Sequence, residues 1–125
     1  MDYRCTIWKK QKDGLYSGIS CNYGGEFSVA GRILLMNYST EEMVDRLIDL
    51  GFLSSIGPTL NECVAYGRDR GELKRMFLNY SIKQADYIVY TRSPKFKYCW
   101  IDGRWYWGLS NLSPLLDTCI KETTK

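Results

Sequence analysis

The chain has 125 residues, of which 45% are hydrophobic and 25% charged, and its formal net charge is +3. These values are typical of one globular domain that folds around its own core, so we expect residues 1–125 to form a single domain. The small charge excess gives no reason to expect nucleic acid as a partner.

The first predicted elements form a β-hairpin. Residues 4–8 alternate as a strand does, an Asp-Gly turn follows at residues 12–14, and residues 15–21 supply the return strand. Glycines then interrupt the chain at positions 24, 25 and 31. The apolar stretch at residues 32–38 fits either a strand or a first helical turn, because its periodicity does not separate the two.

The clearest predicted helix covers residues 39–51. Ser39 and Glu42 form a capping-box pattern at its start, and Gly51 ends it. One face of this helix is apolar, as expected where a helix packs on a core. The residues on that face are Met43, Val44, Leu47 and Ile48.

The middle of the chain is predicted to contain a loop, a helix and a strand. Residues 53–62 are predicted to be a loop because Gly-Pro interrupts them. A second short helix is predicted over residues 72–80 from its helical spacing of apolar side chains, and a strand over residues 85–91, which are rich in Tyr, Ile and Val.

The last part of the sequence contains the strongest hairpin pattern. Two aromatic strands at residues 97–107 flank Asp102-Gly103, and Ser113-Pro114 then opens a last short helix. Strands and helices do not alternate strictly. We therefore predict an α+β fold with an antiparallel sheet and two or three short helices.

The cysteines and the missing histidines limit the chemistry. Since no two cysteines have C-x-x-C spacing and the chain has no histidine, we expect no metal site and no cofactor, and Ser-His and Cys-His catalysis are excluded. The N-terminal residues contain no apolar run, so we expect a cytoplasmic protein without a membrane span. The five thiols are then reduced and mostly buried: Cys5, Cys21, Cys63, Cys99 and Cys119.

The sequence GRDRG at residues 67–71 is a candidate anion site. If this segment is extended, Arg68 and Arg70 point to one face and form a fork suited to phosphate or carboxylate. In the alternative, Asp69 and Glu72 pair with the arginines in a solvated turn at the start of a helix. The sequence alone leaves both interpretations open.

A second candidate is the glycine segment. Gly24 and Gly25 leave backbone N–H groups free to approach a ligand, Tyr23 can stack on a base, and Arg32 follows. The spacing matches neither a Walker loop nor G-x-G-x-x-G, and a plain turn is the alternative.

The aromatic hairpin is a third candidate. Trp105 can stack on a nucleobase, and Arg104 beside it can contact phosphate. The alternative is cross-strand packing, and we expect one face of the hairpin to belong to the core. Because a second aromatic face and open sheet edges need a cover, we predict a homo-oligomer.

Together these segments resemble a family of small bacteriophage proteins. The matching stretches are residues 21–38, STEEMVDRLIDLGFLSSIG at 39–57, VAYGRDRGE at 64–72 and IDGRWYW at 101–107. Where that family has His-Trp-Asp, this chain has Asn22, Tyr23 and Gly24, and Phe27 stands in place of Pro. The departure favours binding over catalysis, and no pair of carboxylates is placed as a general acid and base.

In size and layout, this family is similar to phage anti-defence proteins that sequester cyclic nucleotide signals, notably the Thoeris anti-defence sponge. The resemblance implies a protein of the host cytoplasm that holds a cyclic ADP-ribose isomer or a cyclic oligonucleotide without cleaving it. The alternatives are a protein-binding inhibitor of a host defence enzyme, such as an anti-CRISPR, a nucleotide hydrolase, and a nucleic-acid binder. The residues expected to bind the ligand are Tyr23, Gly24, Gly25, Arg32, Arg68, Arg70, Arg104 and Trp105.

Overall fold

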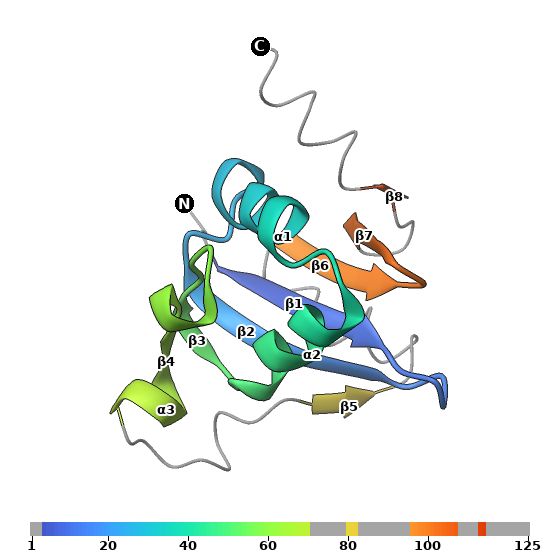
Figure 1. The fold of residues 1–125 in the computed structure, drawn as a ribbon, viewed down its shortest axis with the longest axis horizontal. Helices are drawn as coiled ribbons and strands as arrows, with labels where there is room; N and C mark the ends of the chain where they lie inside the picture. Colours follow the sequence, from blue (N-terminus) through green and yellow to red (C-terminus); the bar gives the residue numbers. More distant parts are fainter. Residues whose placement is uncertain (1–3, 71–79, 83–95, 108–112, 115–125) are drawn as a thin grey trace.

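The computed structural model describes residues 4–70, 80–82, 96–107 and 113–114, which form a β-sheet with helices packed against it (Figure 1). The strands are β1 Cys5–Lys10, β2 Tyr16–Tyr23, β3 Leu53–Ser55, β4 Val64–Ala65, β5 Tyr80–Ile82, β6 Phe96–Ile101, β7 Arg104–Trp107 and β8 Ser113–Pro114. The helical segments are η1 Phe27–Gly31, α1 Arg32–Asn37, α2 Glu41–Asp49, η2 Leu60–Glu62 and α3 Tyr66–Arg70.

The sheet is mixed, and the α+β class is confirmed. The strand order is β4-β3-β2-β1-β6-β7-β8, with β5 also paired to β2. The two predicted hairpins, β1–β2 and β6–β7, are antiparallel. The expectation of an antiparallel sheet throughout is wrong, because β1 pairs with β6 and β2 with β3 in parallel. A strand that returns to the sheet after a helical crossover, as β3 does after α1 and α2, runs parallel to its neighbour.

Helices resolve the ambiguous stretch after the glycines. Residues 32–38 do not form a strand, since α1 continues directly from η1. The predicted helix that follows exists as α2, but its N-cap is Thr40 and not Ser39. The Thr40 hydroxyl accepts a 3.2 Å hydrogen bond from the Met43 N–H, and this bond fixes the first turn one residue later than the pattern suggests. Gly51 follows the helix with φ +78°, as predicted.

Two other predictions about elements are corrected. The loop predicted at residues 53–62 contains β3 and the single turn η2. Ser113-Pro114 does not open a helix but forms β8, which pairs with the last residues of β7. The predicted helix at residues 72–80 lies outside the described residues up to residue 79, and Tyr80 begins β5. The strand at residues 85–91 and the helix after Pro114 also lie outside the described residues.

The main core lies between the sheet and the helices. Alternate residues in β1, β2, β6 and β7 contribute to this core, together with residues of α1 and α2. The predicted apolar stripe of α2 is confirmed, with Met43 packed at its margin. The fully or nearly fully buried members include Cys5, Ile7, Ile19, Cys21, Leu34, Tyr38, Val44, Leu47, Ile48, Leu53, Tyr98, Trp100 and Trp105.

The aromatic hairpin contributes one complete face to this core. Tyr98 lies opposite Trp107, and Trp100 lies opposite Trp105, with the two latter rings edge to face at 5.4 Å. Residues 102 and 103 have positive φ of 49° and 83°, which matches the predicted Asp-Gly turn. The expectation that one hairpin face belongs to the core is therefore confirmed.

A second buried cluster lies on the opposite face of the sheet. It consists of Trp8, Tyr16 and Cys99, with Ile101 packed against it. The described cysteines are all buried free thiols: Cys5, Cys21, Cys63 and Cys99. Cys119 lies outside the described residues.

Candidate functional site

The arginine run is helical and not extended. Residues 66–70 form α3, so the extended backbone on which the expected arginine fork depended is absent. The Arg70 side chain lies outside the described part of the structure.

Arg68 is occupied by its own chain. Its guanidinium donates to both carboxylate oxygens of Asp69, at 2.7 and 2.9 Å, and to the carbonyls of Leu60 and Cys63, at 2.9 and 2.6 Å. Asp69 in turn accepts a 2.8 Å hydrogen bond from the Ala65 N–H. This is the internally paired turn that the sequence left as the alternative, and it leaves Arg68 little capacity to hold a phosphate.

The same contacts favour the charged form of Asp69. The hydrogen bonds from Arg68 and from the Ala65 N–H lower the pKa of Asp69 to about 2, from an ordinary value of 3.8. A carboxylate with a lowered pKa stabilises the fold above its ordinary pKa, and that contribution disappears as the pH falls through the folded-state pKa. We therefore expect acid unfolding of the parent to include a loss of stability between about pH 4 and 2 that Asp69→Asn lacks. Equal slopes of unfolding free energy against pH for the two proteins in this window would contradict this prediction.

In the glycine segment Gly25 is buried, whereas Tyr23, just before the glycines, is exposed. The Gly25 carbonyl is buried and accepts a 2.7 Å hydrogen bond from the Tyr98 hydroxyl. Gly24 has φ +73°, which favours glycine, and its carbonyl accepts from the Ala30 N–H at 3.1 Å. These bonds anchor the turn between β2 and η1. Tyr23, just before them, is 64% exposed and so presents its ring to solvent.

A continuous surface joins this turn to the helix that follows. Val29 approaches Gly24, since a Cβ built on Gly24 would lie 3.3 Å from its side chain. Arg32 and Met36 are four residues apart in α1, a spacing that places them on one face of the helix, and Val29 lies in η1, which α1 continues. We call Tyr23, Val29, Arg32 and Met36 the Tyr23–Met36 surface.

This surface combines exposed apolar side chains with a cation. Tyr23, Val29 and Met36 are the large hydrophobic residues that the described part of the chain exposes, with Met36 at 72%. Arg32 is exposed, and no described residue forms a hydrogen bond or ion pair with its guanidinium. An aromatic ring and an unpaired guanidinium on one surface are the elements that bind a base and a phosphate.

The predicted site residues divide between two ends of the sheet. The Asn22 side chain donates a 2.5 Å hydrogen bond to the Tyr66 hydroxyl, so the glycine segment and the arginine run meet at the end of β2 where β3, β4 and α3 lie (Figure 1). Arg104 begins β7 beside the end of β6, at the opposite end. Trp105 is only 4% exposed, and its indole N–H donates to the Tyr38 carbonyl at 2.8 Å. The structure therefore places Trp105 in the core.

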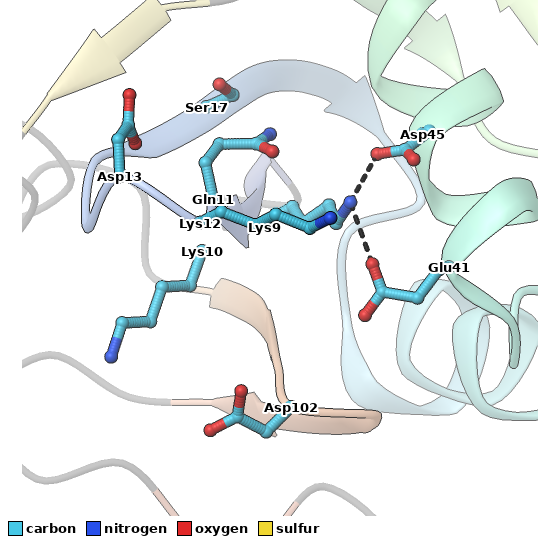
Figure 2. A pocket seen from close by; sticks show the side chains of 9 residues that line it. All are labelled: Lys9, Lys10, Gln11, Lys12, Asp13, Ser17, Glu41, Asp45 and Asp102. Carbon is cyan, nitrogen blue, oxygen red and sulfur yellow. Dashed lines mark hydrogen bonds and ion pairs between the residues drawn. The ribbon is translucent and has the colours of Figure 1, made fainter.

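A polar pocket of about 1060 Å³ lies at that opposite end, between the β1–β2 turn, the β6–β7 turn and α2 (Figure 2). The sequence interpretation missed it, because the residues that line it are far apart in the chain and, of residues 9–14, only 12–14 were interpreted, as a hairpin turn. Four carboxylates outnumber three lysines in its wall, which disfavours an anionic ligand. The wall consists of Lys9, Lys10, Gln11, Lys12, Asp13, Ser17, Glu41, Asp45 and Asp102.

Lys9 is the centre of an ion-pair network in this wall. Its side chain is 9% exposed and its ammonium lies 2.8 Å from Glu41 and 2.5 Å from Asp45, both on α2 (Figure 2). Burial lowers the pKa of Lys9, but the hydrogen bonds that its ammonium donates to Asp45 and Glu41 outweigh burial and leave the pKa raised. The bond from Lys9, followed by that from the Trp100 indole, lowers the pKa of Glu41. The network holds α2 against β1 and has no free cation to offer a ligand at Lys9.

Two further properties bear on function. Within residues 4–70, 80–82, 96–107 and 113–114, no three His, Cys, Asp or Glu side chains are grouped so as to hold a metal ion. In the same ranges, no helix has the length and apolar character needed to cross a membrane.

Comparisons with known proteins do not place the chain in a family. No protein-family model matches the sequence, no curated protein matches it, and no solved structure matches the fold.

Proposed function

We propose that this protein binds and sequesters a signalling nucleotide at the Tyr23–Met36 surface without cleaving it. The observation that carries the proposal is the exposed Tyr23 ring beside Gly24, near the exposed Arg32, whose guanidinium has no partner among the described residues. The ring would stack on the base, and Arg32 would neutralise a phosphate. The anti-defence role, the phage origin and the host cytoplasm as its place of action rest on the sequence resemblance alone.

Removing either binding group should weaken nucleotide binding. We expect Tyr23→Ala to cost about 5- to 100-fold in affinity, since stacking contributes about 1–3 kcal/mol per base. We expect about 10- to 100-fold for Arg32→Ala, which loses charge-assisted hydrogen bonds. The measurement is calorimetric titration with cyclic ADP-ribose isomers and cyclic dinucleotides, followed by denaturation to test whether the ligand is recovered intact.

Two matched variants control this experiment. Tyr23→Phe keeps the ring and should bind as the parent does. Arg46→Ala removes an exposed arginine of α2 that pairs with Glu42 at 2.7 Å, far from the proposed contacts in sequence, and should also bind normally. If Tyr23→Ala and Arg32→Ala both bind the nucleotide with parental affinity, the binding site lies elsewhere. Arg104 is then the next residue to test. Release of cleavage products would support the hydrolase alternative.

A second candidate function follows from the apolar character of the same surface. Exposed Tyr and Met side chains are enriched at protein interfaces, and Tyr23, Val29 and Met36 are exposed together. This favours the alternative of an inhibitor that occupies a host defence enzyme. Met36→Ser distinguishes the two: it removes apolar contact area without placing a charge near Arg32, so it should weaken capture of a protein partner and leave nucleotide affinity within a few-fold of the parent.

We also propose that the protein forms a homo-oligomer, but through a different surface from the one that the sequence suggested. The hairpin aromatics that suggested an oligomer lie in the core, as Tyr98, Trp100 and Trp105 show. The Tyr23–Met36 surface now supplies the apolar area that a second copy could cover. A light-scattering mass of one 14.5 kDa chain at every concentration would rule this part out.

A further inference from the structure

The edge strand β4 lies next to α3, and two side chains of α3 form hydrogen bonds with backbone groups in and just before this strand. In the strand order of the described residues, β4 is the first strand and pairs with β3 alone. Edge strands present a row of unpaired N–H and C=O groups that can pair with a further strand. Two such groups are occupied here: the N–H of Ala65, in β4, donates to Asp69, and the carbonyl of Cys63, just before β4, accepts from Arg68.

The two covered groups point to the same side. Cys63 and Ala65 are two residues apart, and in an extended strand the backbone groups of alternate residues face the same edge. The next residue, Tyr66, donates its N–H to Phe52 O, just before β3, so the intervening groups face inward. Arg68 and Asp69 therefore lie along the outward edge of β4, and Figure 1 shows α3 beside β4 at the margin of the sheet.

We propose that the Arg68–Asp69 pair is an edge plug that prevents β4 from pairing with β4 of a second copy. Each plug residue binds backbone as well as its partner: Arg68 also donates to the Leu60 carbonyl, so the pair is anchored to the strand and to η2 before it. The geometry suits an isologous contact once the plug is gone, because an antiparallel pair of identical strands relates each Cys63 to an Ala65 across a two-fold axis. A charged pair on an edge also opposes approach of an identical edge. The inference does not depend on nucleotide binding.

Removing the Arg68–Asp69 pair should change both the hydrogen exchange of the strand backbone and the light-scattering mass of the protein. In Asp69→Ala the Ala65 N–H loses its acceptor, and its hydrogen exchange should accelerate about 10- to 100-fold relative to the parent. The light-scattering mass of this variant should rise with concentration toward twice the parental value between micromolar and millimolar protein. Asp69→Asn keeps an oxygen acceptor for the Ala65 N–H, so it should resemble the parent in both measurements.

The pair between Arg46 and Glu42 is a matched control, since it is an exposed ion pair that touches only side chains. Arg46→Ala should leave the mass and the exchange of Ala65 unchanged. If Ala65 in Asp69→Ala exchanges fast while the mass stays parental at all concentrations, an open edge does not recruit a second copy and the proposal is overturned. If Asp69→Ala does not fold, Arg68→Ala is used instead. It uncovers the Cys63 carbonyl, and a mass equal to that of the parent at every concentration overturns the proposal equally.

Discussion

Replacing Trp105 with alanine should lower the free energy of unfolding by about 3–5 kcal/mol. The ring is 4% exposed, packs edge to face on Trp100 and bonds the Tyr38 carbonyl through its N–H. Tyr38 itself donates from its hydroxyl to the Gly57 carbonyl at 2.8 Å. Truncation therefore leaves a cavity and an unpaired carbonyl where the hairpin, α1 and the segment after β3 meet.

The effect is measurable by thermal and urea unfolding. Since the total stability of a domain is about 5–15 kcal/mol, we expect a large fall in melting temperature, of about 10–20 °C for this size. Trp105→Phe keeps much of the apolar volume and should cost less, while Arg104→Ala, at an exposed neighbouring position, should stay within about 0.5 kcal/mol of the parent. A Trp105→Ala protein that melts normally but loses nucleotide affinity would restore Trp105 to the ligand site.

The parts of the fold that local sequence determines were predictable. The β6–β7 turn needs two residues with positive φ, and Asp102-Gly103 supplies them in the sequence itself. The apolar stripe of α2 is likewise visible as spacing. Pairings between distant segments carry no such local pattern. The parallel contact of β1 with β6 joins residues about ninety positions apart, so the sequence did not show that the sheet is mixed.

The same distinction between local and long-range features applies to the candidate site. Tyr23 and Gly24 could be selected from the sequence because an aromatic residue next to a turn glycine is a local pattern; in the structure Tyr23 is exposed and Gly24 is half-buried. The sequence left the role of Arg68 open, because that role depends on which groups its guanidinium contacts in the folded chain. The carbonyls of Leu60 and Cys63 compete with any anion, and nothing in GRDRG reveals that they are within reach. The polar pocket around Lys9 was missed for the same reason.

A substitution at Gly18 should destabilise the protein even though it improves strand propensity. Gly18 lies opposite Trp8 in the β1–β2 register, and the indole ring covers its backbone. A Cβ built on Gly18 would lie 2.2 Å from Trp8 Cε3 and 2.3 Å from Cδ2. Because Trp8 is fully buried, its ring has no free space into which to move.

Propensity and packing predict opposite signs at this position. Valine is a better strand residue than glycine by up to about 1 kcal/mol, so propensity alone predicts a gain. Overpacking against a buried ring costs about 1–3 kcal/mol or more, so we expect Gly18→Ala to be less stable than the parent and Gly18→Val to be less stable still.

Gly67→Ala is the matched control for urea unfolding of these variants. Gly67 lies in α3, has no positive φ, and a Cβ there meets nothing within 4 Å, so alanine should stabilise the protein by about 0.5–1 kcal/mol. Trp8→Ala combined with Gly18→Ala should cost less than the sum of the two single losses, since the clash is absent from the double variant. A Gly18→Val protein as stable as the parent would show that the Trp8 ring can move and that propensity dominates at this strand position.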